Sequence, residues 1–493
     1  MTGEKYIISI DQSTQGTKAI LLDSQGKIVA KTSKEHEQIV NDKGWVSHNP
    51  SEIYVNTLFV VGELIKAFKG EPEEILGVGI TNQRETSLAW DRQTGKAIGN
   101  AIVWQCSRAS EICERPELKK VQERINESTG MPLSPYFPAS KIAWILEHEP
   151  TALEKAKTNQ ICHGTIDSWL IYKLTHGQSY KTDYSNASRT QLFNINTLKW
   201  DKEICQYFGI EVENLPEICD SNSCFGYTDF EGLLPHKIPI HGVMGDSHGA
   251  LFGQGCLKPG MVKSTYGTGS SIMMNIGNNP TLSAQGLVTS LAWSIDGRVD
   301  YVLEGNLNYT GAVIRWLKDD LQLIQSPLET EELAREADQL DALYLVPAFS
   351  GLGAPYWDSN AFAMLTGMTR TTKKAELVRA ALDCIAYQIT DIIKVMKEET
   401  GLDIKELRVD GGATKNTYLM EFQSDIAKIK VQVSDVEELS GLGVGFVVGM
   451  SMGLWDEEIF NQVKRRAYLP KMSEERRQEK YSGWKGAVKK TLA

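Results

Sequence analysis

Hydrophobic positions at the start of the chain form short runs of the length typical of β-strands. Residues 6–10, 19–23 and 28–30 are mostly apolar, and a polar loop and a glycine-containing turn separate them. Short apolar runs bounded in this way are typical of strands joined by tight connections. The pattern therefore predicts a strand, a loop over residues 11–18, and two further strands.

A different spacing predicts helices later in the chain. Between residues 378 and 396 the apolar side chains recur every three or four positions, which indicates an amphipathic helix that ends near Gly401. Residues 140–148 and 169–174 also predict helices, and residues 75–81 predict a strand. Strands and helices therefore alternate, as in an α/β protein.

A second strand, loop and strand is predicted over residues 261–274, and its loop is rich in glycine and hydroxyl groups like the loop over residues 11–18. Loops of this composition are common, so the repeat is weak by itself. A chain of 493 residues nevertheless exceeds the roughly 250–300 residues of a single hydrophobic core. We expect two related domains, residues 1–253 and residues 254–493.

Composition narrows the classes of function and location. The formal net charge of −11 argues against a nucleic-acid partner. The eight cysteines form no Cys-x-x-Cys pair, and the chain starts with polar residues, so we expect reduced thiols and a cytoplasmic location. The uncharged stretch 439–455 contains five glycines and is too short for a membrane span. It predicts a buried helix in which Gly441, Gly445 and Gly449 share one face and allow close packing.

Three segments are suited to binding phosphate. Residues 11–18, 266–269 and 409–416 combine small residues with hydroxyl or lysine side chains, so backbone N–H groups can face an anion. Each segment alone could be a surface turn, but the three together favour a nucleotide site. The chain has neither a P-loop pattern nor a Gly-x-Gly-x-x-Gly turn in the context of a dinucleotide fold.

Charged residues in two other segments are suited to an acceptor with several hydroxyl groups. Arg84 offers directed donors next to Glu85, which only accepts, and this pair can hold adjacent hydroxyls. Asp246 follows an apolar run and could act as a base, although an aspartate after glycine is most often a turn residue. Asp11, at the end of the first strand, could hold Mg²⁺ through water. Together these features predict an ATP-dependent kinase for a small polyhydroxy compound.

The order of several segments resembles the FGGY family of carbohydrate kinases, and within it the glycerol kinase branch. The resemblance covers nearly the whole chain, and its main segments are residues 80–86, 100–106, 183–190, 266–269, 348–358 and 407–413. It implies two actin- and hexokinase-like domains of the ribonuclease H-like type, with ATP and acceptor meeting in the cleft between them. It also implies a homodimer or homotetramer.

The resemblance assigns roles by motif position. Asp246 would be the general base and, with Asp11, a Mg²⁺ ligand through water. Arg84, Glu85 and Tyr136 would hold the acceptor, with Trp104 as an apolar wall. The residues implied on the nucleotide side are Thr14, Gln15, Gly16, Lys18, Thr268, Gly311, Arg315, Gly412 and Asn416. The implied reaction is phosphorylation of a primary hydroxyl by ATP, glycerol to glycerol 3-phosphate.

Four departures from the family pattern leave the acceptor open. Ser247 and Ser271 stand where glutamine and phenylalanine are usual, Arg315 stands where glutamine is usual, and the first loop differs and carries Lys18 where arginine is common. Both serines remove bulk, so the acceptor could be a tetritol, pentitol or ketopentose instead of glycerol. A non-catalytic, actin-like nucleotide-binding protein is a third possibility, which the combination of Asp11, Asp246, Arg84 and Glu85 argues against.

Overall fold

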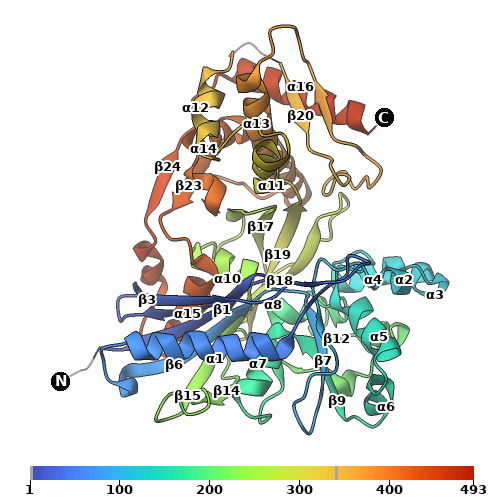
Figure 1. The fold of residues 1–493 in the computed structure, drawn as a ribbon, viewed down its shortest axis with the longest axis vertical. Coiled ribbons are helices and arrows are strands. Elements are labelled where there is room, and N and C mark those ends of the chain that lie inside the picture. Colours follow the sequence, from blue (N-terminus) through green and yellow to red (C-terminus); the bar gives the residue numbers. More distant parts are fainter. Residues whose placement is uncertain (1–3, 339–341, 493) are drawn as a thin grey trace.

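Two mixed β-sheets organise the chain, one in each of two lobes (Figure 1). The computed structural model describes residues 4–338 and 342–492. The first sheet has the strand order β14-β15-β6-β1-β2-β3. Its strands are β1 (Tyr6–Gln12), β2 (Gly16–Leu22), β3 (Ile28–Glu35), β6 (Ile75–Asn82), β14 (Gly226–Thr228) and β15 (Ile238–Gly245). The first three strands confirm the prediction for the start of the chain.

Helices cover both faces of this sheet, and the central strands are mostly apolar until their carboxyl ends, where polar residues follow. Ile7, Ile8 and Ile10 of β1 are all fully buried. Helix α1 (Pro50–Ala67) packs against β1, β2 and β3, and helix α15 (Leu439–Ser451) packs against β1, β6 and β15. A strand covered on both faces reads as a continuous apolar run rather than an alternating one.

The second sheet repeats the arrangement of the first. Its order is β18-β19-β17-β16-β22-β23-β24. The strands are β16 (Val262–Tyr266), β17 (Ser270–Gly277), β18 (Val288–Ile295), β19 (Arg298–Leu307), β22 (Glu406–Asp410), β23 (Lys430–Ser434) and β24 (Arg465–Tyr468). In both sheets three antiparallel strands, β1-β2-β3 or β16-β17-β19, continue into parallel neighbours, β6 and β15 or β22 and β23. The two sheets therefore repeat the same topology, although the repeat was weak in the sequence.

The other elements surround these sheets, and the predicted helices are among them. In the first lobe they are β4 (Ile39–Val40), β5 (Val46–His48), β7 (Ser87–Asp91), β8 (Ala101–Ile102), α2 (Ser110–Cys113), α3 (Pro116–Lys120), α4 (Gln122–Thr129), α5 (Pro138–His148), α6 (Ala152–Lys157), β9 (Ile161–Thr165), α7 (Ile166–Leu174), β10 (Lys181–Asp183), α8 (Tyr184–Ala187), β11 (Phe193–Asn194), β12 (Lys199–Trp200), α9 (Lys202–Tyr207) and β13 (Glu217–Cys219). In the second they are α11 (Gly311–Arg315), α12 (Glu329–Glu336), β20 (Tyr344–Val346), β21 (Met364–Thr366), α13 (Lys374–Thr400), α14 (Thr417–Ala427) and α16 (Glu474–Thr491). Helix α13 ends at Gly401, whose φ of 67° lies in the left-handed region, as the sequence predicted.

Two helices join the lobes. Helix α10 (Asp246–Gly253) and helix α15 pack on each other, α10 also touching the second sheet and α15 the first. A Cβ at Gly443 would lie 1.9 Å from the carbonyl oxygen of Gly249, so the close backbone approach occurs there. The sequence pointed instead to the face of Gly441 and Gly445, which meets side chains of β2. Close packing on that face is confirmed, but another backbone approaches the helix at Gly443 instead, because the spacing of glycines cannot say which face meets another backbone.

No helix in the described part of the chain is long and apolar enough to span a membrane. All eight cysteines carry free thiols, and Cys106, Cys113, Cys162, Cys205, Cys256 and Cys384 are buried.

Candidate active site

The predicted acceptor residues lie at one edge of the first sheet. Strands β1, β6 and β15 are parallel neighbours, so their carboxyl ends meet at the same edge. Asp11 lies near the end of β1, Arg84 and Glu85 follow β6, and Asp246 follows β15 as the first residue of α10. Ligands of α/β proteins bind at such edges. The tertiary structure therefore brings together three segments that are far apart in the sequence.

Asp246 is held in place but remains partly open. Its side chain is 33% exposed, and Oδ1 lies 3.2 Å from Nε of Arg84. The backbone N–H of Ser247 donates to the same oxygen at 2.6 Å. A Cβ at position 245 would lie 2.6 Å from Cγ of Arg84, so Gly245 leaves the space that the arginine stem occupies. A carboxylate oriented this way can meet a ligand hydroxyl.

The fork of Arg84 binds a residue that the sequence analysis did not single out. Its Nη1 and Nη2 atoms donate to Oε2 and Oε1 of Glu304, each at 2.9 Å. Glu304 lies in β19 of the second lobe and is buried. Burial by itself would raise the pKa of Glu304, but the guanidinium groups of Arg84 and Arg189 hold that pKa well below its usual range. Arg84 therefore faces Asp246 with its Nε edge, not with its fork.

Glu85 is fixed by Arg189, the other residue that the prediction lacked. Nε of Arg189 donates to Oε1 of Glu85 at 2.6 Å, and its Nη1 lies 2.9 Å from Oε2 of Glu304. Glu85 has a φ of 60°, a conformation that costs a non-glycine residue roughly 1–3 kcal/mol. Strain of this kind persists where surrounding contacts hold the residue, and it is concentrated at functional sites.

The sequence contained a signal for both Arg189 and Glu304, the two residues that the prediction missed. Arg189 lies inside the segment 183–190 that carried the family resemblance, and Glu304 is a single charge in the apolar strand around residues 301–307. A charge in a buried strand needs a partner. The sequence could not say which partner, because Arg84 is 220 positions away from Glu304.

Two aromatic side chains border the same region. The rings of Trp104 and Tyr136 meet edge to face with their centroids 5.6 Å apart. The indole N–H of Trp104 donates to Oγ1 of Thr14 at 2.9 Å. Thr14 of the first loop, which was expected to face phosphate, therefore contacts the predicted acceptor wall. Burial raises the pKa of Tyr136, so its hydroxyl stays protonated.

The two serines behave differently from each other. Ser271 of β17 donates its hydroxyl to Oε1 of Glu304 at 2.9 Å, so its side chain belongs to the same charged network. Ser247 is partly exposed beside Asp246. The position where phenylalanine is usual therefore carries a hydroxyl group bonded to a carboxylate.

The predicted nucleotide residues of the second lobe lie on loops at the ends of its strands. The backbone N–H of Gly311 donates to the carbonyl of Gly267 at 2.9 Å, which joins the start of α11 to the hairpin loop that contains Thr268. Gly412 is exposed, and no atom lies within 4 Å of the place where its Cβ would be. The structure therefore brings Thr268 and Gly311 together and leaves open space at Gly412.

The remaining predicted residues are more scattered. The side chain of Asn416 caps helix α14 by accepting from the N–H of Leu419 at 2.9 Å, and it also donates to Thr330 at 3.0 Å. Gln15 and Arg315 are exposed. Gly16 begins β2, and Lys18 on that strand is exposed and pairs in register with Asp11 of β1.

Asp11 has properties expected of a group that meets a cation. Burial, followed by the negative charge of Asp246, raises the pKa of Asp11 to about 7. Two carboxylates that disfavour each other's charge would both be stabilised by a divalent cation. No cluster of three or more histidine, cysteine, aspartate or glutamate residues suited to a metal occurs among the residues that the structure describes. Phosphate and water would have to supply the other ligands.

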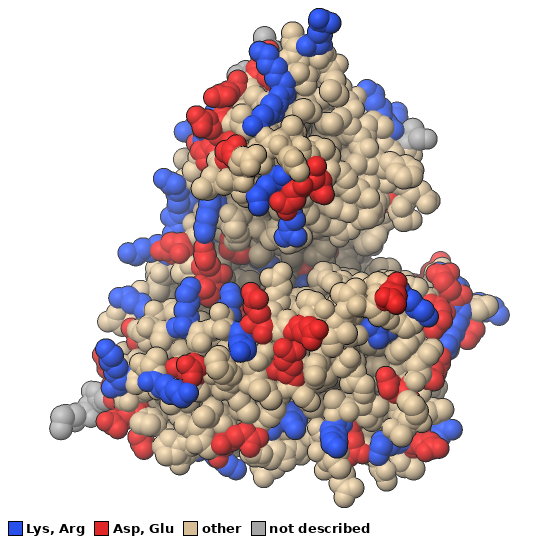
Figure 2. Space-filling model, in the orientation of Figure 1, with Lys and Arg blue, Asp and Glu red and all other residues tan. Residues whose placement is uncertain are grey.

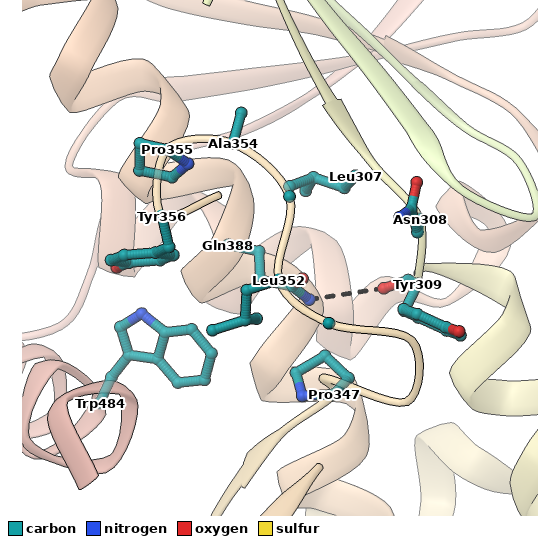
Figure 3. A pocket seen from close by; sticks show the side chains of 12 residues that line it. Leu307, Asn308, Tyr309, Pro347, Leu352, Ala354, Pro355, Tyr356, Gln388 and Trp484 are labelled. Atoms are coloured by element: carbon teal, nitrogen blue, oxygen red, sulfur yellow. Dashed lines mark hydrogen bonds between the residues drawn. The ribbon is translucent and has the colours of Figure 1, made fainter. Parts of the chain in front are cut away.

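Space for ligands lies between the lobes, where the molecule is hollowed (Figure 2). On this face Lys and Arg are interspersed with Asp and Glu, and no large region of one sign is present. A separate small pocket in the second lobe is bordered by Asn308, Pro347, Tyr356, Gln388 and Trp484 (Figure 3). It has room for about 10 Å³, roughly one water molecule, so it cannot hold an acceptor or a nucleotide.

Comparison with known proteins agrees with this architecture. The N-terminal domain model of the FGGY family of carbohydrate kinases matches residues 6–253, and the C-terminal domain model matches residues 262–452. The chain is 48% identical to glycerol kinase 1 of Thermotoga maritima and 45% identical to the glycerol kinase of Caldanaerobacter subterraneus, in each case over 99% of both chains.

Solved structures show the same relationship. The crystal structure of Plasmodium falciparum glycerol kinase with ADP has a TM-score of 0.93 and 36% identity, and the match covers 99% of this chain and 98% of that one. A gluconate kinase from Lactobacillus acidophilus shares the fold, with a TM-score of 0.89 and 22% identity, covering 99% of this chain and 97% of that one. The chain therefore belongs to the FGGY family of carbohydrate kinases and is an ATP-dependent kinase with two actin- and hexokinase-like domains.

Proposed function

We propose that this kinase transfers the γ-phosphoryl group of ATP to a primary hydroxyl of glycerol and forms glycerol 3-phosphate. The observation that carries the proposal is the position of Asp246, a partly open carboxylate beside Arg84 and at the same sheet edge as Glu85. The relatives that match over their full length are named glycerol kinases, which supports glycerol as the acceptor.

Each acceptor residue has a role that fits its chemistry. Asp246 accepts the proton of the attacking hydroxyl as the oxygen bonds to phosphorus. The Nε edge of Arg84 donates to an acceptor oxygen, and Glu85 accepts from a neighbouring hydroxyl. Trp104 and Tyr136 cover the carbon chain. Closing the lobes would exclude water, so that transfer to the acceptor competes favourably with hydrolysis.

The nucleotide and its metal would occupy the space between the two strand edges. Thr14, Gln15, Gly16 and Lys18 would face the phosphates from the first lobe, and Thr268, Gly311, Arg315, Gly412 and Asn416 would contact ATP from the second. Asp11 and Asp246 would hold Mg²⁺ through water, which fits the raised pKa of Asp11. Bound Mg²⁺ supplies positive charge that neutralises the phosphate oxygens during transfer.

A coupled assay of ADP release tests the proposal. Glycerol, erythritol, other tetritols, pentitols, dihydroxyacetone and ketopentoses are compared with Mg-ATP and ranked by kcat/KM. Glycerol at the top of the ranking supports the proposal. ATP hydrolysis that no acceptor accelerates would contradict it and favour the non-catalytic, actin-like alternative.

A larger acceptor is the second candidate, and Ser271 supports it. Its hydroxyl on Glu304 makes that wall polar, and Ser247 leaves space beside Asp246. A tetritol, pentitol or ketopentose would then find both room and hydrogen-bond partners. Such an acceptor would exceed glycerol in kcat/KM by about 100-fold, a difference of roughly 2.7 kcal/mol in transition-state binding.

We also propose a cytoplasmic homodimer or homotetramer whose domains divide at residue 253, without nucleic-acid or membrane partners. The free thiols and the net charge of −11 support the location and the lack of a nucleic-acid partner, the bounds of the two family models support the domain division, and the assembly rests on the family resemblance alone. Light scattering coupled to size-exclusion chromatography tests the assembly, and a single species at the 54.9 kDa mass of one chain would contradict it.

A further inference from the structure

Glu304 joins the two lobes at the acceptor end of the site. It lies in β19 of the second sheet, whereas Arg84 and Arg189 belong to the first lobe. Oε1 accepts from Nη2 of Arg84 and from the hydroxyl of Ser271, each at 2.9 Å. Oε2 accepts from Nη1 of Arg84 at 2.9 Å and lies 2.9 Å from Nη1 of Arg189. The side chain of Glu304 is fully buried, so these contacts replace all of its water.

Negatively and positively charged side chains alternate through this group of residues. From Asp246 the chain of contacts leads to Arg84, then to Glu304, then to Arg189, and ends at Glu85. Both ends of the chain are proposed to meet the acceptor, and Glu304 is its centre. A buried carboxylate between two guanidinium groups is stable only while both are present, because an unpaired buried charge is costly.

The geometry shows what Glu304 does for its neighbours. By taking both Nη atoms of Arg84 it turns Nε towards Asp246, at 3.2 Å. Because Glu304 pairs with Nη1 of Arg189, Nε of Arg189 is directed towards Glu85 and donates to it at 2.6 Å. One carboxylate therefore sets the orientation of two arginines, and through them the two groups that are proposed to hold the acceptor.

We propose that Glu304 is a positioning residue for phosphoryl transfer, which aligns the acceptor groups from the opposite lobe. This inference rests on the function proposed above. Because Glu304 belongs to the sheet that carries the nucleotide loops, the acceptor residues take their working geometry only when the lobes are in register. The acceptor side of the kinetics therefore depends on Glu304, and the affinity for the nucleotide does not.

The test is Glu304→Gln in the full-length enzyme. Glutamine keeps the shape but offers an amide group to one guanidinium and removes the charge. Loss of one charge-assisted hydrogen bond from Arg84, together with the negative charge that pairs with Arg189, predicts a fall in kcat/KM for the acceptor of about 100-fold. The KM for Mg-ATP and the Kd for ADP should change by less than about threefold, since the variant leaves the nucleotide loops intact.

Two further variants separate positioning from stability. Glu304→Asp keeps the charge on a shorter side chain. Its kcat/KM for the acceptor should be about tenfold higher than that of Glu304→Gln. Glu406→Gln is the matched control, because Glu406 binds Arg408 and Lys430 in the same sheet, at the start of β22. Glu406→Gln should lower the melting temperature. It should leave the ratio between the kcat/KM for the acceptor and the KM for Mg-ATP unchanged.

Several outcomes would overturn the inference. If Glu304→Gln lowers the melting temperature but leaves the acceptor kcat/KM like that of Glu406→Gln, Glu304 is only a structural residue. If Glu304→Gln does not fold, Ser271→Ala removes one hydrogen bond from the same carboxylate and should still lower the acceptor kcat/KM about fivefold. No change in that variant would count equally against the proposal.

The proposed function fails in a different way. If Asp246→Asn keeps acceptor-dependent turnover, the assignment of the base is wrong whatever Glu304 does. If Asp246→Asn abolishes turnover and Glu304→Gln has no selective effect, only the positioning role is wrong.

Discussion

The two sheets share one topology but present different chemistry at their carboxyl edges. In the first lobe the edge of β1, β6 and β15 carries Asp11, Arg84, Glu85 and Asp246. In the second lobe the corresponding edge of β16 and β22 carries one buried carboxylate, Asp410, which accepts from Gln254, and otherwise mostly small residues, among them Thr268 and Gly412. The same strand order therefore supports a cluster of charged side chains on one side of the cleft and mainly exposed small residues on the other.

This difference shows how a duplicated scaffold can divide a two-substrate reaction. A hydroxylated acceptor needs directed donors and acceptors, whereas a nucleotide needs backbone N–H groups and space. Glu304 is the exception, because it brings a charge from the second lobe into the acceptor network of the first. Glu304 is therefore the residue at which the division of acceptor-binding and nucleotide-binding groups between the lobes is incomplete.

The largest effect is expected at the charged edge. Asp246→Asn keeps the shape of the side chain but removes the proton acceptor, so turnover should fall by about 10³-fold. The Kd for ADP, measured by calorimetry, should remain within about twofold. Asp296→Asn, an exposed aspartate in the turn between β18 and β19, is the control. Acceptor-dependent turnover that survives in Asp246→Asn would remove Asp246 from the role of base.

At the other edge, Gly412→Val should weaken nucleotide binding alone. The new side chain would enter open space, since no atom lies within 4 Å of the Cβ position, and the fold should tolerate it. The KM for ATP should rise about tenfold, or ~1.4 kcal/mol, with the order of preferred acceptors unchanged. Gly486→Val in α16 is matched, because its Cβ position is equally open. A change in acceptor preference in Gly412→Val would show that the two edges are not separate.

The pH dependence of Mg²⁺ binding tests Asp11. Its carboxyl, with a pKa of about 7, is mostly protonated below that pH, and a cation must displace the proton. The apparent affinity for Mg²⁺ should therefore rise about tenfold between pH 6 and pH 8, and Asp11→Asn should remove this dependence. An affinity that stays constant with pH in the unaltered enzyme would contradict the role of Asp11.

The same raised pKa determines whether the free energy of unfolding rises or falls with pH when no metal is bound. The folded protein binds the Asp11 proton more tightly than the unfolded chain, whose carboxyl has a pKa of 3.8. Between these two values the folded state holds more protons, so this group makes the free energy of unfolding fall as the pH rises. Chemical denaturation of the wild type and of Asp11→Asn, without Mg²⁺, measures the difference.

The smallest effect is expected from the two serines. The double variant Ser247→Gln and Ser271→Phe narrows the pocket and removes the hydroxyl from Glu304. Preference should shift towards glycerol, relative to larger acceptors, by about fivefold. The ratio of kcat/KM values for glycerol and a pentitol measures it, and each single variant is the control. An unchanged ratio in the double variant would mean that the serines do not set specificity.

Local patterns predicted much of the fold because they depend on neighbours in the sequence. The strand at the start of the chain, the helix ending at Gly401 and a buried helix within the stretch 439–455, observed over Leu439–Ser451, were all recognisable. The close packing of Gly441, Gly445 and Gly449 was predicted, but the backbone contact of Gly443 with Gly249 was not, since it depends on a segment almost 200 positions away.

The candidate site was predicted less completely for the same reason. Arg84 was expected to offer its fork to the acceptor, and the structure gives that fork to Glu304 instead. Glu85 was recognised as an acceptor of hydrogen bonds, but its partner Arg189 and its left-handed backbone were not. A single sequence shows which groups can donate or accept, and not which of them are already occupied.

The sequence by itself determined the family, the kinase chemistry and the residue types at each end of the cleft, because short motifs carry these. Only the tertiary structure decided how those residues are paired. The paired repeat of the sheets, the crossing of α10 and α15, and the network around Glu304 all join segments that are distant in the chain. Such contacts form when burial removes water from charged and apolar groups together, so they depend on the packed lobes rather than on any local pattern.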